Sequence, residues 1–400
     1  MLMTPEAVYE RSAMVLAAGR AGALGHFSVN DDALEPTAAY VAGVIRDNYP
    51  TLTVPYHARW RHFVVDGEDR WQAIADRLDV EPSERARIRF DLAAVSVLLD
   101  AGAGPRWGYR DARTGRRFAR SEGLALASLD AFVAGLFSSD PRRPMQADAE
   151  ALRSLTADAL AAAFQADSDN PLDGLDGRVE VLRRLGEQLA RAPHYFGSAP
   201  GRFGNLFDRM ASEAACGPLP ARHILVAVLD ALAPIWPGRI TLGGINLGDT
   251  WRHSAVRTGD ATDGLIPFHK LSQWLAYSLV EPLEEAGVAV VGLDGLTPLA
   301  EYRNGGLLVD CGVIVPKHDG VRERTHAPGD EVVVEWRALT VGLIAELAHH
   351  VRRALGRTAD EMPLASVLEG GTWAAGRRIA ADRRADGGPP IRVVSDGSVF

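Results

Sequence analysis

Apolar residues recur at helical spacing through most of the chain, and this periodicity limits the fold more than any other feature. The clearest run follows Pro267, which suits the first position of a helix because its missing N–H needs no partner there. Gly287 is expected to end that helix. The apolar residues between them lie three or four apart and define one face: Phe268, Leu271, Leu275, Leu279 and Leu283.

The same periodicity predicts further helices, most of them bounded by Pro or Gly. Between these helices, the sequence predicts short strands only. The expected helices cover residues 5–19, 36–49, 82–101, 149–164, 177–192, 223–236, 267–287 and 337–355, with another beginning near 121. The expected strands and hairpins are a hairpin turning at 111–115, a hairpin on Gly243-Gly244, a short buried strand over 288–293, a strand or loop over 51–65, and a strand or helix entry over 332–336. We therefore expect a mainly α fold with short β-strands and hairpins.

A length of 400 residues favours two domains over one. The polar, Pro-containing segment 140–148 is the best candidate for a linker. We expect an N-terminal domain of helices and hairpins over residues 1–145 and a catalytic helical domain over residues 146–400.

The composition excludes several classes of function. A net charge of −9 argues against nucleic acid as a partner, because neutralising phosphates requires a basic surface. The two cysteines, Cys216 and Cys311, form no metal-binding or disulfide pattern, so we expect no metal site and a reducing, cytoplasmic location. The N-terminus lacks the pattern of a signal peptide, and the longest apolar run, 224–236, is too short for a bilayer.

Two carboxylates carry the strongest chemical signal. Asp294 and Glu301 flank a Leu-Thr-Pro turn, and Tyr302 and Arg303 follow directly. Two carboxylates at one cavity can differ in pKa, so that one stays ionised while the other holds a proton. We take both as catalytic candidates, and the sequence leaves open which is the base. The alternative is that Asp294 caps a helix and Glu301 pairs with Arg303.

The helix after Pro267 carries a second face. Lys270, Trp274, Tyr277 and Glu281 fall at helical spacing opposite the leucines, with Gln273 beside them. A solvated face rarely carries both Trp and Tyr, so we expect this face to line a pocket. The alternative is an exposed face with a Lys–Glu contact.

Other segments suit substrate binding. Glu335 and Arg337 support the site or form an ion pair. His57 and Arg61 belong to a dense aromatic and basic cluster suited to an anion or a ring. Arg377 follows Gly370-Gly371 in what reads as a glycine-opened helix start, where exposed N–H groups and cations suit a phosphate. Packing and solvated readings remain open for all of these.

Common nucleotide and hydrolase signatures are missing from the chain. The glycines of 371–376 precede two arginines where a phosphate-binding loop needs Lys-Ser/Thr. The segment GDATDG, 259–264, is faintly similar to a phosphoribosyl-diphosphate loop. Such a loop requires a preceding apolar strand that ends in two acids, and the segment that precedes it here, RHSAVRT, is not such a strand.

At these residues the chain resembles a known family. Phrases such as PYHARWRHF, LIPFHKLSQWLAYSL, GLTPLAEYRNGGLLVD and LEGGTWAAGRR are characteristic of the uracil catabolism protein four family, some of whose members are labelled uracil phosphoribosyltransferase. The resemblance implies a pathway that opens the pyrimidine ring while ribose is attached and then releases urea.

A more distant resemblance bears on chemistry. The order of motifs is similar to that of the queuosine 5′-phosphate N-glycosylase (queuosine salvage) family. The matching residues are Pro171-Leu172 with Arg178, Lys270 with Gln273, Asp294 with Leu296-Thr297, Ala300 to Arg303, and Glu335 with Arg337-Ala338. This resemblance implies a DNA-glycosylase-like helical architecture, here with an N-terminal extension, and hydrolysis of an N-glycosidic bond. Glu301 stands where that family has aspartate, so we expect a different substrate.

These observations lead to a hydrolase hypothesis. The protein is expected to cleave an N-ribosyl compound of uracil breakdown, most concretely ribosylurea 5′-phosphate to urea and ribose 5-phosphate. Glu301 or Asp294 would orient water and stabilise the sugar cation. Lys270 and Arg303 would hold phosphate or ribose hydroxyls, and Trp274, Tyr277 and Tyr302 would wall the ring site. No cofactor, metal, nucleic acid or membrane is expected, and a homo-oligomer is left open. The alternatives are a Mg²⁺-dependent uracil phosphoribosyltransferase and a non-enzymatic scaffold.

Overall fold

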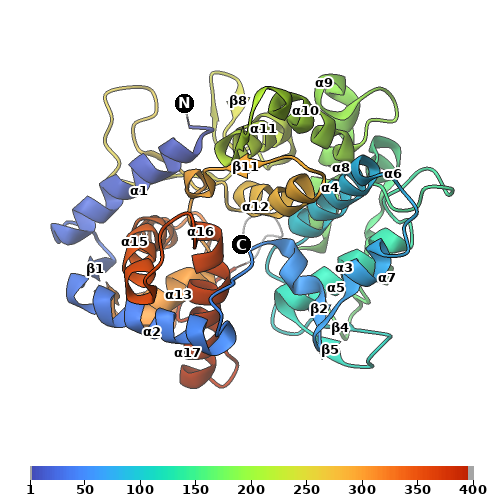
Figure 1. Ribbon diagram of the computed structural model, residues 1–400. Coiled ribbons are helices and arrows are strands. Elements are labelled where there is room, and N and C mark those ends of the chain that lie inside the picture. The colour runs from blue at the N-terminus through green and yellow to red at the C-terminus, as the bar shows by residue number, and fades with distance from the viewer. Residues whose placement is uncertain (1, 395–400) are drawn as a thin grey trace. The chain divides into compact units, whose positions relative to one another are not determined.

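The computed structural model describes residues 2–394. Helices make up most of these residues, and the strands are two or three residues long and pair only in twos (Figure 1). The prediction of a mainly α fold is therefore confirmed. The likeness to DNA glycosylases stays an expectation. Among residues 2–394, none of the helices combines the length and the apolarity needed to cross a bilayer.

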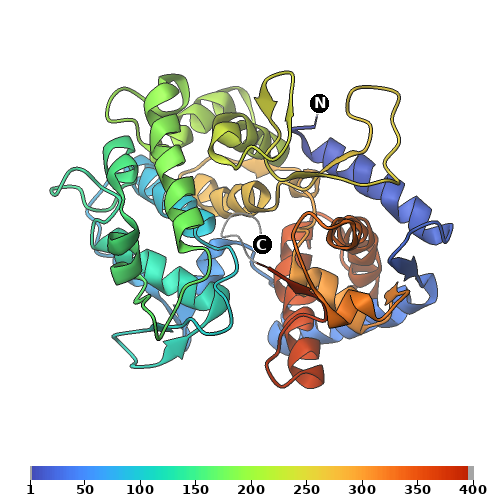
Figure 2. The same cartoon turned by 180° about the vertical axis from the view of Figure 1, so that it is seen from behind.

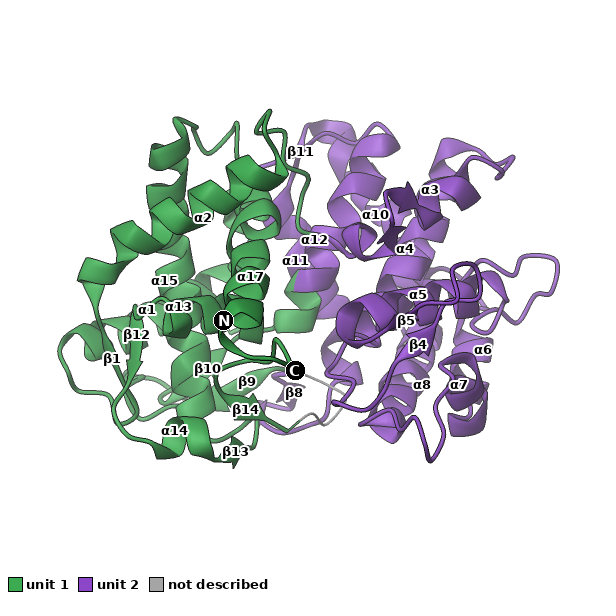
Figure 3. Ribbon diagram, turned by 90° about the horizontal axis from the view of Figure 1, so that it is seen from below, with its two compact units in different colours: residues 1–57, 249–273, 292–394 green, residues 58–248, 274–291, 395–400 purple. Residues whose placement is uncertain are grey.

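The chain forms two compact units, coloured green and purple in Figure 3. Of the described residues, unit 1 contains 2–57, 249–273 and 292–394, and unit 2 contains 58–248 and 274–291. Both units draw on sequence from either side of residue 145, so their limits do not coincide with the predicted boundary at 145. The division between them falls inside helix α12 (Lys270–Glu285).

Unit 1 is built around the long helix α15 (Glu331–Leu355), against which α1 (Pro5–Arg20) and α2 (Leu34–Asn48) pack. The N-terminal helices, in blue, lie beside the C-terminal ones, in red, in Figure 1 and from behind in Figure 2. The remaining helices are η1 (Asp31–Ala33), η6 (Leu293–Gly295), α13 (Tyr302–Asp310), α14 (Gly320–Glu323), α16 (Leu364–Ser366), the π-helix η7 (Val367–Trp373) and α17 (Ala374–Arg383). The strand pairs are β1 (Phe27–Val29) with β12 (Ile314–Pro316), β9 (Thr250–Arg252) with β10 (Leu265–Pro267), both antiparallel, and β13 (Thr325–His326) with β14 (Arg392–Val393), parallel.

In unit 2, α4 (Pro82–Leu98) packs on α5 (Arg120–Val133), and α8 (Leu175–Arg191) packs on α6 (Ala149–Ser154) and α7 (Ala157–Ala163). The predicted helix over 177–192 corresponds to α8, and its residues Val179, Leu182, Leu185 and Leu189 form a buried apolar face. The other helices are η2 (Arg59–Phe63), α3 (Arg70–Ala75), α9 (Pro193–Phe196), η3 (Phe203–Asn205), α10 (Leu206–Glu213), η4 (Ala214–Cys216), α11 (Ala221–Leu232) and η5 (Ala233–Ile235). The strand pairs are β2 (Val64–Val65) with β3 (Glu68–Asp69), β4 (Tyr109–Arg110) with β5 (Arg117–Phe118), β7 (Thr241–Leu242) with β8 (Ile245–Asn246), and β6 (Leu219–Pro220) with β11 (Val290–Val291).

The predicted start of the helix after Pro267 is wrong. Pro267 ends strand β10, and α12 begins only at Lys270. His269 adopts a left-handed backbone conformation with φ of 50°, which interrupts any helix beginning at Pro267. Asp249 provides the cap instead, since its Oδ2 accepts the Lys270 N–H at 3.0 Å.

Other local predictions also need correction. The helix expected over 149–164 breaks at Leu155, where Thr156 caps α7 by accepting the Ala159 N–H. The short strand near 290 is partly exposed rather than buried, with Val291 44% exposed. Residues 59–63 form a 3₁₀ helix rather than a strand or loop. Of the two possibilities for residues 332–336, the helix entry is confirmed, because α15 begins at Glu331.

The glycine-opened helix start expected at Gly370 is wrong as well. Both glycines lie inside the π-helix η7 and are buried. A Cβ on Gly370 would lie 2.7 Å from Val54, and one on Gly371 would lie 3.0 Å from Val41. These glycines therefore permit close packing, and their N–H groups are not an exposed phosphate cradle.

Candidate active site in unit 1

A buried ion pair braces the predicted site in unit 1. Both terminal nitrogens of Arg337 donate to the Asp249 carboxylate at 2.8 Å. Arg337 also donates from Nε to the Ala300 carbonyl at 3.3 Å, directly before Glu301, and its guanidinium lies 4.2 Å from the Phe268 ring centre. The positive charge and hydrogen bonds of Arg337 outweigh burial and hold the pKa of Asp249 well below its usual range. This pair fixes the segment leading into Glu301.

Glu301 caps helix α13. Its carboxylate accepts the N–H of Arg303 at 2.6 Å and the N–H of Asn304 at 2.7 Å. The residue is only 9% exposed, and burial raises the pKa of its carboxyl above the ordinary value. The two backbone N–H bonds and the positive charges of Lys270 and His57 lower this pKa but do not cancel the effect of burial. Glu301 is thus a buried carboxylate that takes up a proton more readily than an exposed one.

His57, whose charge lowers the pKa of Glu301, is held by a buried glutamate. His57 Nδ1 lies 2.7 Å from Glu369 Oε2, and both side chains are buried. The His57 ring lies 5.7 Å from the Trp373 ring, centre to centre, and the Arg377 guanidinium lies 4.9 Å from the Trp373 ring centre. The structure therefore brings two predicted residues, His57 and Arg377, to one aromatic side chain.

The π-helix η7 supplies several of these contacts. Glu369 holds His57, while Thr372 donates its hydroxyl to Asn304 Oδ1 at 2.8 Å, next to the Glu301 cap. Asn304 in turn donates to the Leu299 carbonyl at 3.2 Å. Single π-turns within helices are frequent at functional sites. Here the wider turn places two polar side chains on the residues that surround Glu301.

Lys270 and Gln273 come from the first turn of α12. Gln273 accepts the Thr297 N–H at 3.0 Å and donates to the Phe268 carbonyl at 3.1 Å, and so fixes the Leu-Thr-Pro turn. Lys270 is half-buried, and its charge acts on the pKa of Glu301. The charges of Lys270 and His57 thus act on the same carboxyl, that of Glu301, and both lower its pKa.

Asp294 has a different set of partners. Its carboxylate pairs with Arg352 at 2.8 Å and accepts the Leu364 N–H at 2.7 Å, at the start of α16. The contacts of Asp294 therefore match the alternative in which it caps a helix. The alternative in which Glu301 pairs with Arg303 differs from what is found, because Glu301 accepts the backbone N–H of Arg303 rather than a guanidinium N–H. A catalytic role for Asp294 stays a prediction, and Glu301 has the more enclosed environment.

The remaining predicted residues of unit 1 are anchored in various ways. Arg303 donates to the Gly387 carbonyl at 2.9 Å, and its guanidinium lies 5.0 Å from the ring centre of Tyr302. Glu335 is buried and accepts the N–H groups of His26 and Phe27 at 3.1 Å and 2.8 Å, a bracing contact for strand β1. Arg377 is exposed. Substrate contacts of these residues stay predictions.

Three predicted residues belong to unit 2. Trp274 and Tyr277 are buried on α12, so the face opposite the leucines is not an exposed one. The Trp274 ring packs edge-on against His62 with centres 5.5 Å apart. Arg61 pairs with Glu281 at 2.9 Å.

Comparison with known proteins assigns the family. The chain matches the family described as "Protein of unknown function (DUF1688)" over residues 1–400. It belongs to the DUF1688 family. It is 38% identical to "Protein urg3" of Schizosaccharomyces pombe over all of this chain and 98% of that protein. It is 35% identical to "Uracil catabolism protein 4" of Lachancea kluyveri over 94% of this chain and 92% of that protein. The predicted resemblance to the uracil catabolism protein four family is confirmed.

Several residues of this DUF1688 site were missed from sequence. Glu369, Asn304, Thr372 and Asp249 contact predicted residues or their neighbours, and Glu369 and Asp249 lie far from their partners along the chain. Glu369 is 312 positions from His57, and Asp249 is 88 positions from Arg337. Only the phrase LEGGTW, with a lone acid in an apolar and glycine-rich stretch, could have drawn attention to Glu369. Within residues 2–394, no cluster of three or more His, Cys, Asp or Glu side chains could hold a metal ion.

Proposed function

We propose that this protein is an N-ribosyl hydrolase of uracil catabolism. The name of the relative "Uracil catabolism protein 4" supports the pathway. The single observation that supports this chemistry is the buried carboxyl of Glu301. Its burial raises its pKa, and the charges of His57 and Lys270 act on it in the opposite direction. The proposed substrate is ribosylurea 5′-phosphate, cleaved to urea and ribose 5-phosphate.

Cleavage of an N-glycosidic bond passes through a sugar cation at C1′, which a nearby carboxylate stabilises. In the proposed reaction, Glu301 stabilises that cation and takes one proton from the attacking water, whose oxygen bonds to C1′. The C1′–N bond breaks, and the departing urea nitrogen receives a proton from His57, which Glu369 holds in place. The Glu301 proton then returns to His57, so one water is consumed for each bond broken.

The positive groups have a separate task in this proposal. Lys270 binds the 5′-phosphate or ribose hydroxyls, with Arg303 and Arg377 as further candidates. Arg337 and Asp249 act at a distance by positioning the Ala300 carbonyl before Glu301. Burial raises the pKa of Glu301, and the charges of Lys270 and His57 oppose this rise, which favours the ionised form that accepts a proton from water.

The test is incubation of the purified full-length chain with ribosylurea 5′-phosphate, measuring urea and ribose 5-phosphate. Glu301→Gln should lower kcat by about 10²- to 10⁴-fold, the usual contribution of a general base. Asp69→Asn is the matched control, because Asp69 also caps a helix, α3, through its side chain. Asp294→Asn, assayed separately, decides which carboxylate is the base.

Three outcomes would overturn the proposal or the mechanism assigned to it. Full activity in Glu301→Gln would remove the assigned mechanism. Uracil-dependent consumption of phosphoribosyl diphosphate, with no release of urea from the riboside, would favour the phosphoribosyltransferase alternative. If the protein neither turns over nor binds any pyrimidine-derived riboside, the scaffold alternative holds.

A further inference from the structure

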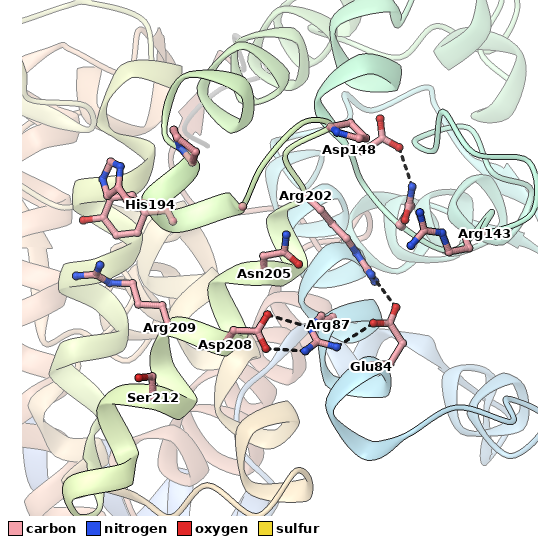
Figure 4. Close-up of a pocket in the computed structure, with 15 residues that line it drawn as sticks. Glu84, Arg87, Arg143, Asp148, His194, Arg202, Asn205, Asp208, Arg209 and Ser212 are labelled. Atoms are coloured by element: carbon pink, nitrogen blue, oxygen red, sulfur yellow. Dashed lines mark hydrogen bonds and ion pairs between the residues drawn. The ribbon is translucent and has the colours of Figure 1, made fainter.

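Unit 2 contains a cavity that the proposed reaction does not use. Its volume is about 700 Å³, within the range of small-molecule sites. The walls come from the start of α4, from α9 and from α10, and most lining side chains are polar or charged (Figure 4). None of the residues assigned to the proposed hydrolase lines it.

A buried arginine at this cavity has an unused donor. Arg202 is only 8% exposed, donates from Nε to Asp91 at 2.5 Å and donates from Nη1 to Glu84 at 2.7 Å. Its Nη2 is buried and has no hydrogen-bond partner among residues 2–394. A buried N–H that lacks an acceptor is costly, so this nitrogen suits an oxygen supplied by a bound molecule.

A second arginine supplies positive charge. Arg209 lies over the Tyr195 ring, 4.6 Å from its centre, and the Tyr195 hydroxyl donates to Asp230. Within the part of the chain that the structure describes, Arg209 forms no ion pair with a carboxylate. Arg87 differs from it, because Asp208 and Glu84 both pair with Arg87. Arg209 is therefore held in place by stacking while its charge remains available.

The remaining lining offers partners for hydroxyl groups. Asn205 donates to the Phe196 carbonyl at 2.8 Å, which orients its amide and leaves the Asn205 carbonyl oxygen to accept from a ligand. The carboxylates of Glu84 and Asp208 pair with arginines but keep further lone pairs. A ligand with an anionic group and several hydroxyls would satisfy these groups together, which an apolar molecule would not.

We propose that this cavity binds a small phosphorylated polyol. Its anionic group is taken by Arg209, one of its oxygens accepts from Arg202 Nη2, and its hydroxyls bond to Asn205 and the neighbouring carboxylates. The site does not depend on the proposed hydrolase activity. The ligand class follows from charge and hydrogen-bonding groups alone, and ribose 5-phosphate and inorganic phosphate are suitable probes.

The experiment is hydrogen–deuterium exchange of the full-length chain with ribose 5-phosphate, inorganic phosphate or neutral ribose, combined with calorimetry. We expect ribose 5-phosphate to protect residues 193–212, inorganic phosphate to do so more weakly, and ribose not at all. Arg209→Ala should weaken binding at least tenfold. Arg191→Ala is the control, because Arg191 is exposed on α8 outside the cavity lining and pairs with Glu187 in the same helix.

The outcomes separate this proposal from the hydrolase. Glu301→Gln protein should show the same protection of residues 193–212 as the wild type, even if it has no activity. Unchanged affinity in Arg209→Ala, or equal protection by ribose, would overturn the proposal. No protection by either phosphate probe would do the same, since the cavity would then hold solvent only. Arg202→Lys is a second variant, and it should bind ribose 5-phosphate more weakly than the wild type. Its melting temperature, measured separately, shows whether the variant is still folded.

Discussion

At the scale of single residues, Glu301 combines two tasks that usually fall to different side chains. It caps α13 with two backbone hydrogen bonds, and its burial raises the pKa of its carboxyl. The cap holds the side chain in one orientation, and burial keeps water from screening its charge. A preorganised carboxylate of this kind suits the stabilisation of a sugar cation.

The first prediction concerns the pH dependence of the proposed reaction. Glu301 must be ionised to accept a proton, and its pKa is raised above 4.5. The activity, measured as kcat/KM, should therefore fall on the acid side with a midpoint above 4.5, rather than at the ordinary value. Glu369→Gln should lower activity because it removes the carboxylate that holds His57. A profile that stays flat down to pH 4.5 would contradict the assignment of Glu301 as the base.

The second prediction concerns the ion pair between Asp249 and Arg337. Asp249→Asn leaves a buried arginine without its counter-charge, so the free energy of unfolding should fall by about 3–5 kcal/mol. Urea denaturation measures this difference. Asp31→Asn is the control, since Asp31 pairs with Arg20 at the exposed surface and little change is expected.

The same pair gives a signed pH effect. The pKa of Asp249 is depressed in the folded protein, so its stabilising contribution is complete above the unfolded value of about 3.9. That contribution is lost as the pH falls from there toward the folded pKa. The stability difference between wild type and Asp249→Asn should therefore shrink below about pH 4. A difference that grows in acid would show that the pair is not the source of the stability.

At the scale of elements, the sequence predicts helices well where the signals are local. The leucine face of α8 and the Pro-bounded start of α4 follow from spacing and from a residue within the same helix. The start of α12 could not be predicted this way, because its cap comes from Asp249, 21 positions upstream. The site was predicted in part for the same reason: Glu301 and Lys270 sit in recognisable motifs, whereas the pairing of His57 with Glu369 depends on tertiary packing.

The third prediction compares two helical glycines. Gly370→Ala should destabilise the protein by about 1–3 kcal/mol, because overpacking a tight contact forces its neighbours to move. The new Cβ would lie 2.7 Å from Val54 and 3.0 Å from Tyr49. The Cβ added by Gly43→Ala in α2 would meet no neighbouring atom within 4 Å. This substitution should therefore stabilise the folded protein by about 0.5–1 kcal/mol. Thermal and urea unfolding distinguish the two, and equal effects would contradict the packing argument.

At the scale of the whole molecule, each unit is assembled from separated stretches of sequence. In unit 1, α1 and α2 from the N-terminal stretch cover α15, and β1 pairs with β12. Neither the N-terminal nor the C-terminal part of the chain therefore contains unit 1 by itself. This interleaving explains why a boundary chosen from local composition at residue 145 does not match the units.

The fourth prediction tests that interleaving. Residues 1–145 and residues 146–400, expressed separately, should each fail to show a cooperative thermal transition by circular dichroism. Co-expression of the two fragments should recover one, because the contacts of α1 and α2 with α15 can then form. A cooperative transition in the isolated fragment 146–400 would instead support the domain division predicted from the sequence.

The π-helix η7 makes the length of the chain near Glu369 as important as its composition. Deleting one residue from this wide turn would restore ordinary α-helical winding, in which each residue turns further about the helix axis than in a π-helix. Glu369 and Thr372, which both lie within η7, would then change their orientation relative to each other and could not reach His57 and Asn304 together. A relative that is one amino acid shorter there could keep every polar group named above and still be unable to assemble them.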